Sequence, residues 1–129
     1  MVFKTPTTAS FPPYQVEVPV TISSGGTASN IIDTNGMVIA AVRMPAAWTA
    51  ATLGIESGAT ATTAAMQPVY KQGEATATLY TEAATTSGIF PISAYATWGG
   101  RYTRLISGHT TTSVAQGGDR VITVVLRYF

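Results

Sequence analysis

The sequence predicts an all-β domain, an antiparallel β-sandwich with jelly-roll-like character and about eight short strands. Thr, Val and Ile recur along the chain, and β-branched side chains favour strands. Gly, Pro and Asn turn signals separate short apolar segments roughly every 10 to 15 residues, a spacing typical of a sandwich or barrel. No ten-residue window shows the 3.6-residue apolar period of an amphipathic helix.

The first half of the chain holds the clearest strand pattern. Residues 14–22 alternate strictly, with Tyr14 and every second residue after it apolar. Pro19 cannot donate a ladder hydrogen bond, which predicts an edge strand or a bulge. Residues 30–33 form a short candidate strand, and the Asn-Gly pair that follows predicts a hairpin turn. Residues 37–44 are apolar on both faces until Arg43, as in a central strand.

The second half is predicted in the same way. Residues 45–51 are expected to form a loop or a single helical turn, and the Thr/Ala-rich residues 59–65 and the stretch 108–119 are expected to form loops. The predicted strands are 52–57, with Leu53 and Ile55 inward, then 66–71, 74–81, 89–93, 101–107, and 120–128, with Ile122, Val124 and Leu126 on one face.

The length of 129 residues corresponds to one domain, which can bury a core without metals or disulfides. We expect an extended N-terminal arm over residues 1–13, because three prolines fix the backbone there and little apolar surface accompanies them. Residues 14–129 then form a single β-sandwich domain. The arm is expected either to fray or to lie on a neighbouring subunit.

Composition excludes several classes of function. The chain has no Cys, which excludes disulfide scaffolds, thiol nucleophiles and cysteine metal sites. The seven basic residues are scattered and the net charge is +1, so no nucleic-acid partner is expected. The longest apolar run, 37–42, is too short to span a membrane, and the N-terminus has no secretory signal pattern. The protein is therefore expected to be made in a cytoplasm, or exported by another route, and to stay soluble.

Low charge is the most informative bulk property. Only 10% of residues are charged, against about 25% in typical soluble domains. A weakly charged surface rich in Thr, Ser, Ala and Gly resists association poorly. A compact β-domain with hydroxyl-bearing faces would explain this composition, but we favour a surface that is largely covered by other subunits.

Candidate catalytic groups are few. The only His, His109, lies near Ser107, Ser113 and Asp119, but neither a G-x-S-x-G motif nor a fixed spacing accompanies it. Segment 33–36 resembles a fragment of a calcium loop without the remaining acidic ligands. We therefore expect no catalytic residue, cofactor or metal. The carboxylates from which a glycosidase pair could be drawn are Glu17, Asp33, Glu56, Glu74, Glu82 and Asp119.

Aromatic residues leave a second possibility open. They could form a sugar-stacking platform, although aromatic residues in small β-domains more often pack in the core. The candidates are Trp48, Trp98, Tyr70, Tyr80, Tyr95 and Tyr102.

Four segments resemble a known family. They are Trp48-Thr49-Ala50-Ala51-x-Leu53-x-Ile55-x-Ser57, Pro68-Val69-Tyr70, Gly100-Arg101-Tyr102-x-Arg104-Leu105-x-Ser107-Gly108, and Gln116-Gly117-Gly118-Asp119-Arg120-Val121-Ile122-x-Val124-Val125-Leu126-Arg127. This pattern of strand residues and turns resembles the capsid decoration (cement) proteins of tailed bacteriophages. The first 45 residues lie outside the resemblance.

The resemblance implies a non-enzymatic virion protein at the capsid surface. It would bind the major capsid protein lattice and form a homo-oligomer, a trimer by analogy with the family. Two alternatives remain: a tail-associated β-sandwich module that binds a carbohydrate or a receptor, and a hydrolase built on the same sandwich around His109.

Overall fold

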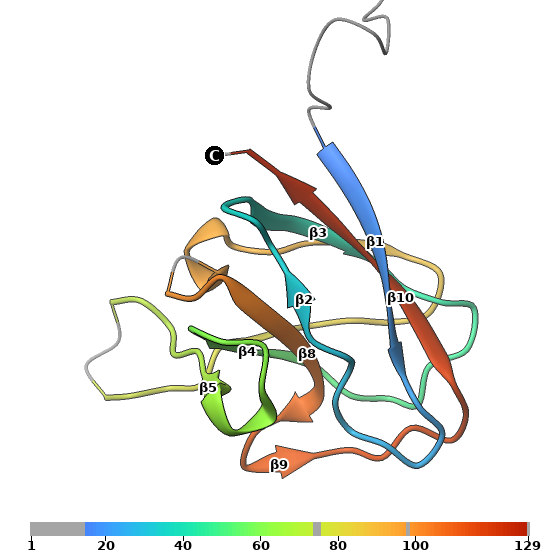
Figure 1. The fold of residues 1–129 in the computed structure, drawn as a ribbon. Coiled ribbons are helices and arrows are strands. Elements are labelled where there is room, and N and C mark those ends of the chain that lie inside the picture. Colours follow the sequence, from blue (N-terminus) through green and yellow to red (C-terminus); the bar gives the residue numbers. More distant parts are fainter. Residues whose placement is uncertain (1–14, 74–75, 98, 129) are drawn as a thin grey trace, which may run out of the picture.

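The computed structural model describes residues 15–73, 76–97 and 99–128, which form two packed antiparallel sheets (Figure 1). Within these ranges the chain forms ten strands and two short 3-10 helices. The strands are β1 (Gln15–Ile22), β2 (Ile32–Asp33), β3 (Val38–Arg43), β4 (Leu53–Gly58), β5 (Gln67–Pro68), β6 (Thr81–Glu82), β7 (Ile89–Pro91), β8 (Tyr102–His109), β9 (Thr112–Ser113) and β10 (Arg120–Arg127). The helices are η1 (Thr63–Ala65) and η2 (Ala94–Thr97).

The strand order is that of a jelly roll. One sheet, here called sheet A, has the order β1-β10-β3-β7. The other, sheet B, has the order β2-β8-β4-β5, with β6 on the same edge of β4 as β5. The pairs are nested along the chain, because β1 pairs with β10, β2 with β8, β3 with β7, and β4 with β5 and β6. Successive pairs alternate between the sheets, so the predicted sandwich is confirmed.

The core lies between the two sheets. Alternate residues of each long strand point inward, as the period of two predicts. In β10 the inward residues are Ile122, Val124 and Leu126, and in β4 they include Leu53 and Ile55, so both predicted inward sets are confirmed. The other fully buried apolar side chains include Val20, Ile22, Ile39, Val42 and Leu105.

The edges of the sheets carry prolines. The edge strand β1 contains Pro19, which confirms the edge prediction, and the edge strands β5 and β7 end in Pro68 and Pro91. The predicted central strand over 37–44 is confirmed as β3, which lies between β10 and β7. Proline lacks the N–H donor that a further strand would need, so these edges are poor templates for strand addition.

Three predictions were wrong in part. Segment 66–71 forms a strand only at Gln67–Pro68, and the described part of 74–81 is a strand only at Thr81. Small Ala and Thr side chains there cannot bury enough surface, so an exposed hairpin forms, held by a bridge between Tyr70 and Leu79. The predicted loop 108–119 contains β9, which pairs with the end of β8.

The Asn-Gly turn is present but has a different role. Asn35 and Gly36 have φ values of 50° and 82°, and the N–H of Met37 donates to the carbonyl oxygen of Thr34 at 2.9 Å. This turn joins β2 to β3, which lie in different sheets, so it is a corner of the sandwich rather than a hairpin. Residues 1–13 and Tyr14 lie outside the described residues.

Candidate interaction surface

The outer face of sheet B is covered by the chain's own loops. All six residues of β4 are buried, including those that point away from the core. A Cβ placed on Gly54 would lie 2.9 Å from the carbonyl oxygen of Gly108, and one on Gly58 would lie 2.6 Å from that of Ala65. The last residues of β8 and the η1 helix therefore lie directly against β4, and glycine permits this approach.

A buried ion pair lies beneath these loops. The side chain of Glu56 accepts hydrogen bonds from Arg104 Nε at 2.7 Å and from the Thr110 hydroxyl at 2.8 Å. Arg104 Nη2 also lies 2.6 Å from the same carboxylate oxygen, Oε1. Glu56 is only 5% exposed, so this carboxylate is a structural group and is closed to a ligand.

The outer face of sheet A has no such cover within the described residues. Its side chains come from the positions that alternate with the core residues in all four strands. Ile89 is 64% exposed and Val121 is 50% exposed, and both lie on this face. The face consists of Gln15, Glu17, Pro19, Thr21, Ala41, Arg43, Ile89, Pro91, Val121, Thr123, Val125 and Arg127.

One ion pair crosses this face. Arg43 Nη2 lies 2.9 Å from Glu17 Oε1, so the contact spans from β3 to β1 over β10. Val125 faces Glu17 in the strand register and is only 6% exposed. Both charged side chains are about half exposed, so the pair contributes little to stability, and Arg127 at the end of β10 is the other charged residue of the face.

The side chains considered for a hydrolase each lie in a separate local environment. Ser107 is fully buried, and its hydroxyl accepts a hydrogen bond from Gln116 Nε2 at 2.8 Å. Asp119 accepts the backbone N–H of Ser24 at 2.8 Å, which holds the β1–β2 turn. His109 Nδ1 lies 3.2 Å from the N–H of Thr112, a bond that holds the β8–β9 turn. Ser113 lies exposed in β9. These groups stabilise turns, and the structure does not assemble them into a triad.

Gln116 is a structural residue that sequence analysis missed. Its side chain is 1% exposed and bonds both backbone groups of Thr49, at 2.8 Å to the N–H and 3.0 Å to the carbonyl oxygen. Its remaining side-chain partners are Ser107 Oγ and Arg120 Nε. All four hydrogen-bonding positions of the amide are thus used, and one side chain joins three segments of the chain.

The other carboxylates also have structural partners. Arg101 holds Asp33 through two bonds of 2.8 Å, and together with the backbone N–H of Asn35 this lowers the pKa of the Asp33 carboxyl. Glu82 accepts the Tyr80 hydroxyl at 2.6 Å. Within the described ranges no three His, Asp or Glu side chains gather as metal ligands. Glu74 lies outside the described residues.

The aromatic candidates do not form one platform in the described part of the chain. Tyr80 and Tyr95 pack edge to face with ring centroids 5.5 Å apart, and Tyr80 is buried. Burial and the bond to Glu82 raise the pKa of Tyr80 to about 12. Tyr102 lies beneath Arg101, and Tyr70 is half exposed on the hairpin. Trp98 lies outside the described residues.

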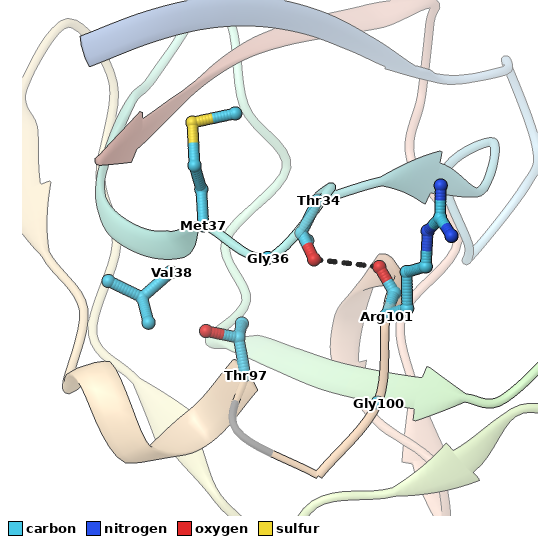
Figure 2. Close-up of a pocket in the computed structure, with 7 residues that line it drawn as sticks. All are labelled: Thr34, Gly36, Met37, Val38, Thr97, Gly100 and Arg101. Atoms are coloured by element: carbon cyan, nitrogen blue, oxygen red, sulfur yellow. Dashed lines mark hydrogen bonds between the residues drawn. The ribbon is translucent and has the colours of Figure 1, made fainter. Parts of the chain in front are cut away.

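Grooves indent the described part of the surface, among them the following two. The first, of about 570 Å³, lies between the β2–β3 turn and the start of β8, where the Thr34 hydroxyl donates to the Arg101 carbonyl oxygen at 2.7 Å (Figure 2). Its lining is mostly apolar and includes Met37 and Val38. The second, of about 500 Å³, is lined by Trp48 together with Thr52, Thr85 and Thr86.

No protein-family model, no curated protein and no solved structure matches the chain. Among the described residues, none of the helices has the length and apolar character needed to cross a membrane.

Proposed function

We propose that this protein is a structural component of a bacteriophage virion, a decoration protein that binds the major capsid protein lattice as a homo-oligomer. The observation that carries the proposal is the outer face of sheet A, which spans four strands and whose charged residues are Arg127 and one internally paired Glu and Arg. Such a face suits contact with another protein surface and offers little to a charged ligand.

Three further features support the proposal. The candidate catalytic side chains Ser107, His109 and Asp119 take part in the hydrogen bonds of turns and loops. The low charge of the chain favours association with other subunits. A decoration protein binds its shell through many repeated contacts, so each contact can be weak while the assembly is stable.

Binding to shells tests the proposal. Purified protein is mixed with phage capsids that lack it, and the mixture is sedimented and imaged by electron microscopy. We expect the protein to sediment with the shells at regular surface positions and to raise the temperature at which they open. A protein that stays in the supernatant at every concentration and leaves shell stability unchanged would refute the proposal.

The groove beside Trp48 supports a second candidate, a tail-associated module that binds a carbohydrate or a receptor. An indole ring next to three threonine side chains offers a stacking surface and hydroxyl groups for a sugar. A glycan array followed by titration of Trp fluorescence tests this candidate, with Trp48→Ala as the control. Loss of sugar binding in this variant would favour the second candidate, and no binding by either protein would eliminate it.

A further inference from the structure

The chain contains two asparagines, and they differ in the residue that follows. Asn30 precedes Ile31, whereas Asn35 precedes Gly36. An asparagine side chain is lost when the backbone nitrogen of the next residue attacks its carbonyl carbon, so the next residue controls access to the reaction. A β-branched side chain such as that of Ile31 crowds this nitrogen, and glycine leaves it open. The sequence therefore makes Asn35 the more reactive of the two.

The hydrogen bonds of the two side chains increase this difference. Asn30 Oδ1 accepts the backbone N–H of Thr21 at 2.9 Å, which holds the Asn30 amide in place. Among the described residues, neither the Asn35 side chain nor the Gly36 N–H has a hydrogen-bond partner. Asn35 and Gly36 are both exposed, and a Cβ placed on Gly36 would meet no atom within 4 Å. The atoms that would react at Asn35 are therefore unpaired and accessible to water.

The β2–β3 turn restrains the backbone on both sides of this peptide bond. The N–H of Asn35 donates to Asp33 Oδ1 at 2.8 Å, and the N–H of Met37 donates to the Thr34 carbonyl oxygen at 2.9 Å. Neither bond uses the Asn35 side chain or the Gly36 nitrogen. Bringing these two groups together needs a rotation at Asn35 that breaks turn bonds at an exposed corner. The turn therefore slows the reaction relative to an unfolded chain, but the core need not open.

We propose that Asn35 is a site of spontaneous deamidation, with water as the only co-reactant. The Gly36 nitrogen gives its proton to the solvent and forms a bond to Asn35 Cγ, the bond from Cγ to Nδ2 breaks, and ammonia leaves. The product is a five-membered succinimide, which water opens at either carbonyl to give aspartate or isoaspartate. Gln72 and Gln116 also precede glycine, but their longer side chains must close a six-membered ring, which forms more slowly.

The new carboxylate changes the charge of the whole protein. Both products carry one more negative charge, so the formal net charge falls from +1 to zero. The charge also appears two residues from Asp33, whose carboxylate is already bound by Arg101. A protein with a net charge near zero associates more readily than one that is charged. Deamidation at this single position therefore promotes association of the modified protein.

The two products affect the turn differently. Aspartate followed by glycine suits the same backbone conformation, so the aspartate product keeps the turn. Isoaspartate adds a carbon atom to the main chain, which displaces the Met37 N–H from the Thr34 carbonyl oxygen. Thr34, Gly36 and Met37 of this turn also line the groove of Figure 2. The isoaspartate product therefore has an altered corner and an altered groove.

Incubation of the purified full chain in mildly alkaline buffer tests the proposal. Samples taken over time are separated by isoelectric focusing and digested with trypsin for mass spectrometry. We expect a more acidic form that is heavier by about one dalton. The tryptic peptide 5–43 contains both asparagines, so fragmentation of this peptide assigns the change. Conversion at Asn35 is expected to be about tenfold or more faster than at Asn30.

Asn35→Gly is the matched control, because glycine adopts the positive φ of this position and cannot deamidate. Loss of the acidic form in this variant supports the proposal, and an acidic form that persists overturns it. Equal conversion of Asn30 and Asn35 also overturns it, as does a folded chain that stays intact while the chain unfolded in urea reacts at Asn35. If Asn35→Gly does not fold by circular dichroism, fragmentation of the wild-type peptide decides alone. Shell binding tests the proposed function separately.

Discussion

At the residue scale, a few buried polar side chains hold the loops of this sandwich in place. Gln116 bonds the backbone of Thr49 in both directions and reaches Ser107 and Arg120 as well. Glu56 binds Arg104 and Thr110 beneath the loops of sheet B. Among the described residues no buried side-chain polar atom lacks a hydrogen-bond partner. Loss of one such group would leave several others unpaired.

Replacing Gln116 is expected to destabilise the protein strongly. Gln116→Leu keeps a similar volume but leaves buried groups of Thr49 and Ser107 without partners, at a cost of about 3 kcal/mol in the free energy of unfolding. Urea denaturation followed by Trp fluorescence measures the change. Gln72→Leu, at an exposed turn, serves as the control, and equal stability of the two variants would contradict this role of Gln116.

The two arginine–carboxylate pairs are expected to differ in their contributions. Glu56→Ala leaves Arg104 mostly buried and unpaired, which costs about 3 to 5 kcal/mol in the free energy of unfolding. Asp33→Ala breaks an exposed pair with Arg101 and costs about 1 kcal/mol or less. Unfolding in urea compares the variants, and a larger loss in Asp33→Ala would reverse our assignment.

Tyr80 predicts a loss of stability at high pH. Its pKa rises from 10.0 to about 12 in the folded protein, because the side chain is buried and donates to Glu82. The folded state therefore holds this proton more tightly, and the contribution to stability is complete below pH 10 and is lost between pH 10 and 12. The free energy of unfolding, measured across this pH range, should fall less steeply with pH in Tyr80→Phe than in the wild-type protein. Identical slopes would show that other groups cause the loss.

At the element scale, glycines set how closely the loops approach sheet B. Gly54 faces the backbone of Gly108, whose φ of 87° turns the chain from β8 toward β9. A side chain at Gly54 would push the end of β8, and with it the turn to β9, away from β4. The packing of this element depends on the absence of one methyl group.

Gly54→Ala is accordingly expected to lower the free energy of unfolding by about 1 to 3 kcal/mol. The new Cβ would lie 2.9 Å from a backbone oxygen that cannot move without displacing the turn. Gly99→Ala is the matched control, because open space surrounds that position and about 0.5 kcal/mol or less is expected. Thermal unfolding of both variants checks the difference, and similar melting temperatures would count against the tight contact.

The long strands were predictable because their patterns are local. Strict alternation predicts β1, the apolar set Ile122, Val124 and Leu126 on one face predicts β10, and turn residues bound β4 and β8 closely. The nested pairing was not predictable, since β1 pairs with β10 across almost the whole chain and no local pattern encodes that contact. The structural role of Gln116 was not predictable either, because a single Gln in a Gly-rich loop has the same local sequence pattern as an exposed residue. The glycines inside β4 were a usable sign of close backbone approach.

At the scale of the whole molecule, the chain's own loops cover the outer face of sheet B, whereas no described loop covers the outer face of sheet A. The nested pairs bring both long strands of the chain ends, β1 and β10, into sheet A (Figure 1). β1, the first strand of the described chain, is an edge strand of sheet A and pairs only with β10.

Deletion of residues 1–13 is expected to leave the fold intact and to weaken assembly. The core residues described above all lie after Gln15, so far-ultraviolet circular dichroism and the urea midpoint should match those of the full chain. Sedimentation with capsids should decrease. A truncated protein that unfolds would instead place those residues in the core.

The edge prolines have a consequence for how this protein survives at high concentration. Most proteins remain dispersed because like charges repel, but a chain with 10% charged residues and a net charge of +1 has little of that protection. The edge prolines protect the protein in another way, because an added strand finds no N–H donor at Pro19, Pro68 or Pro91 and fibril growth needs that pairing. Replacing Pro19 with Thr would preserve the native contacts while making the protein prone to form amyloid at high concentration.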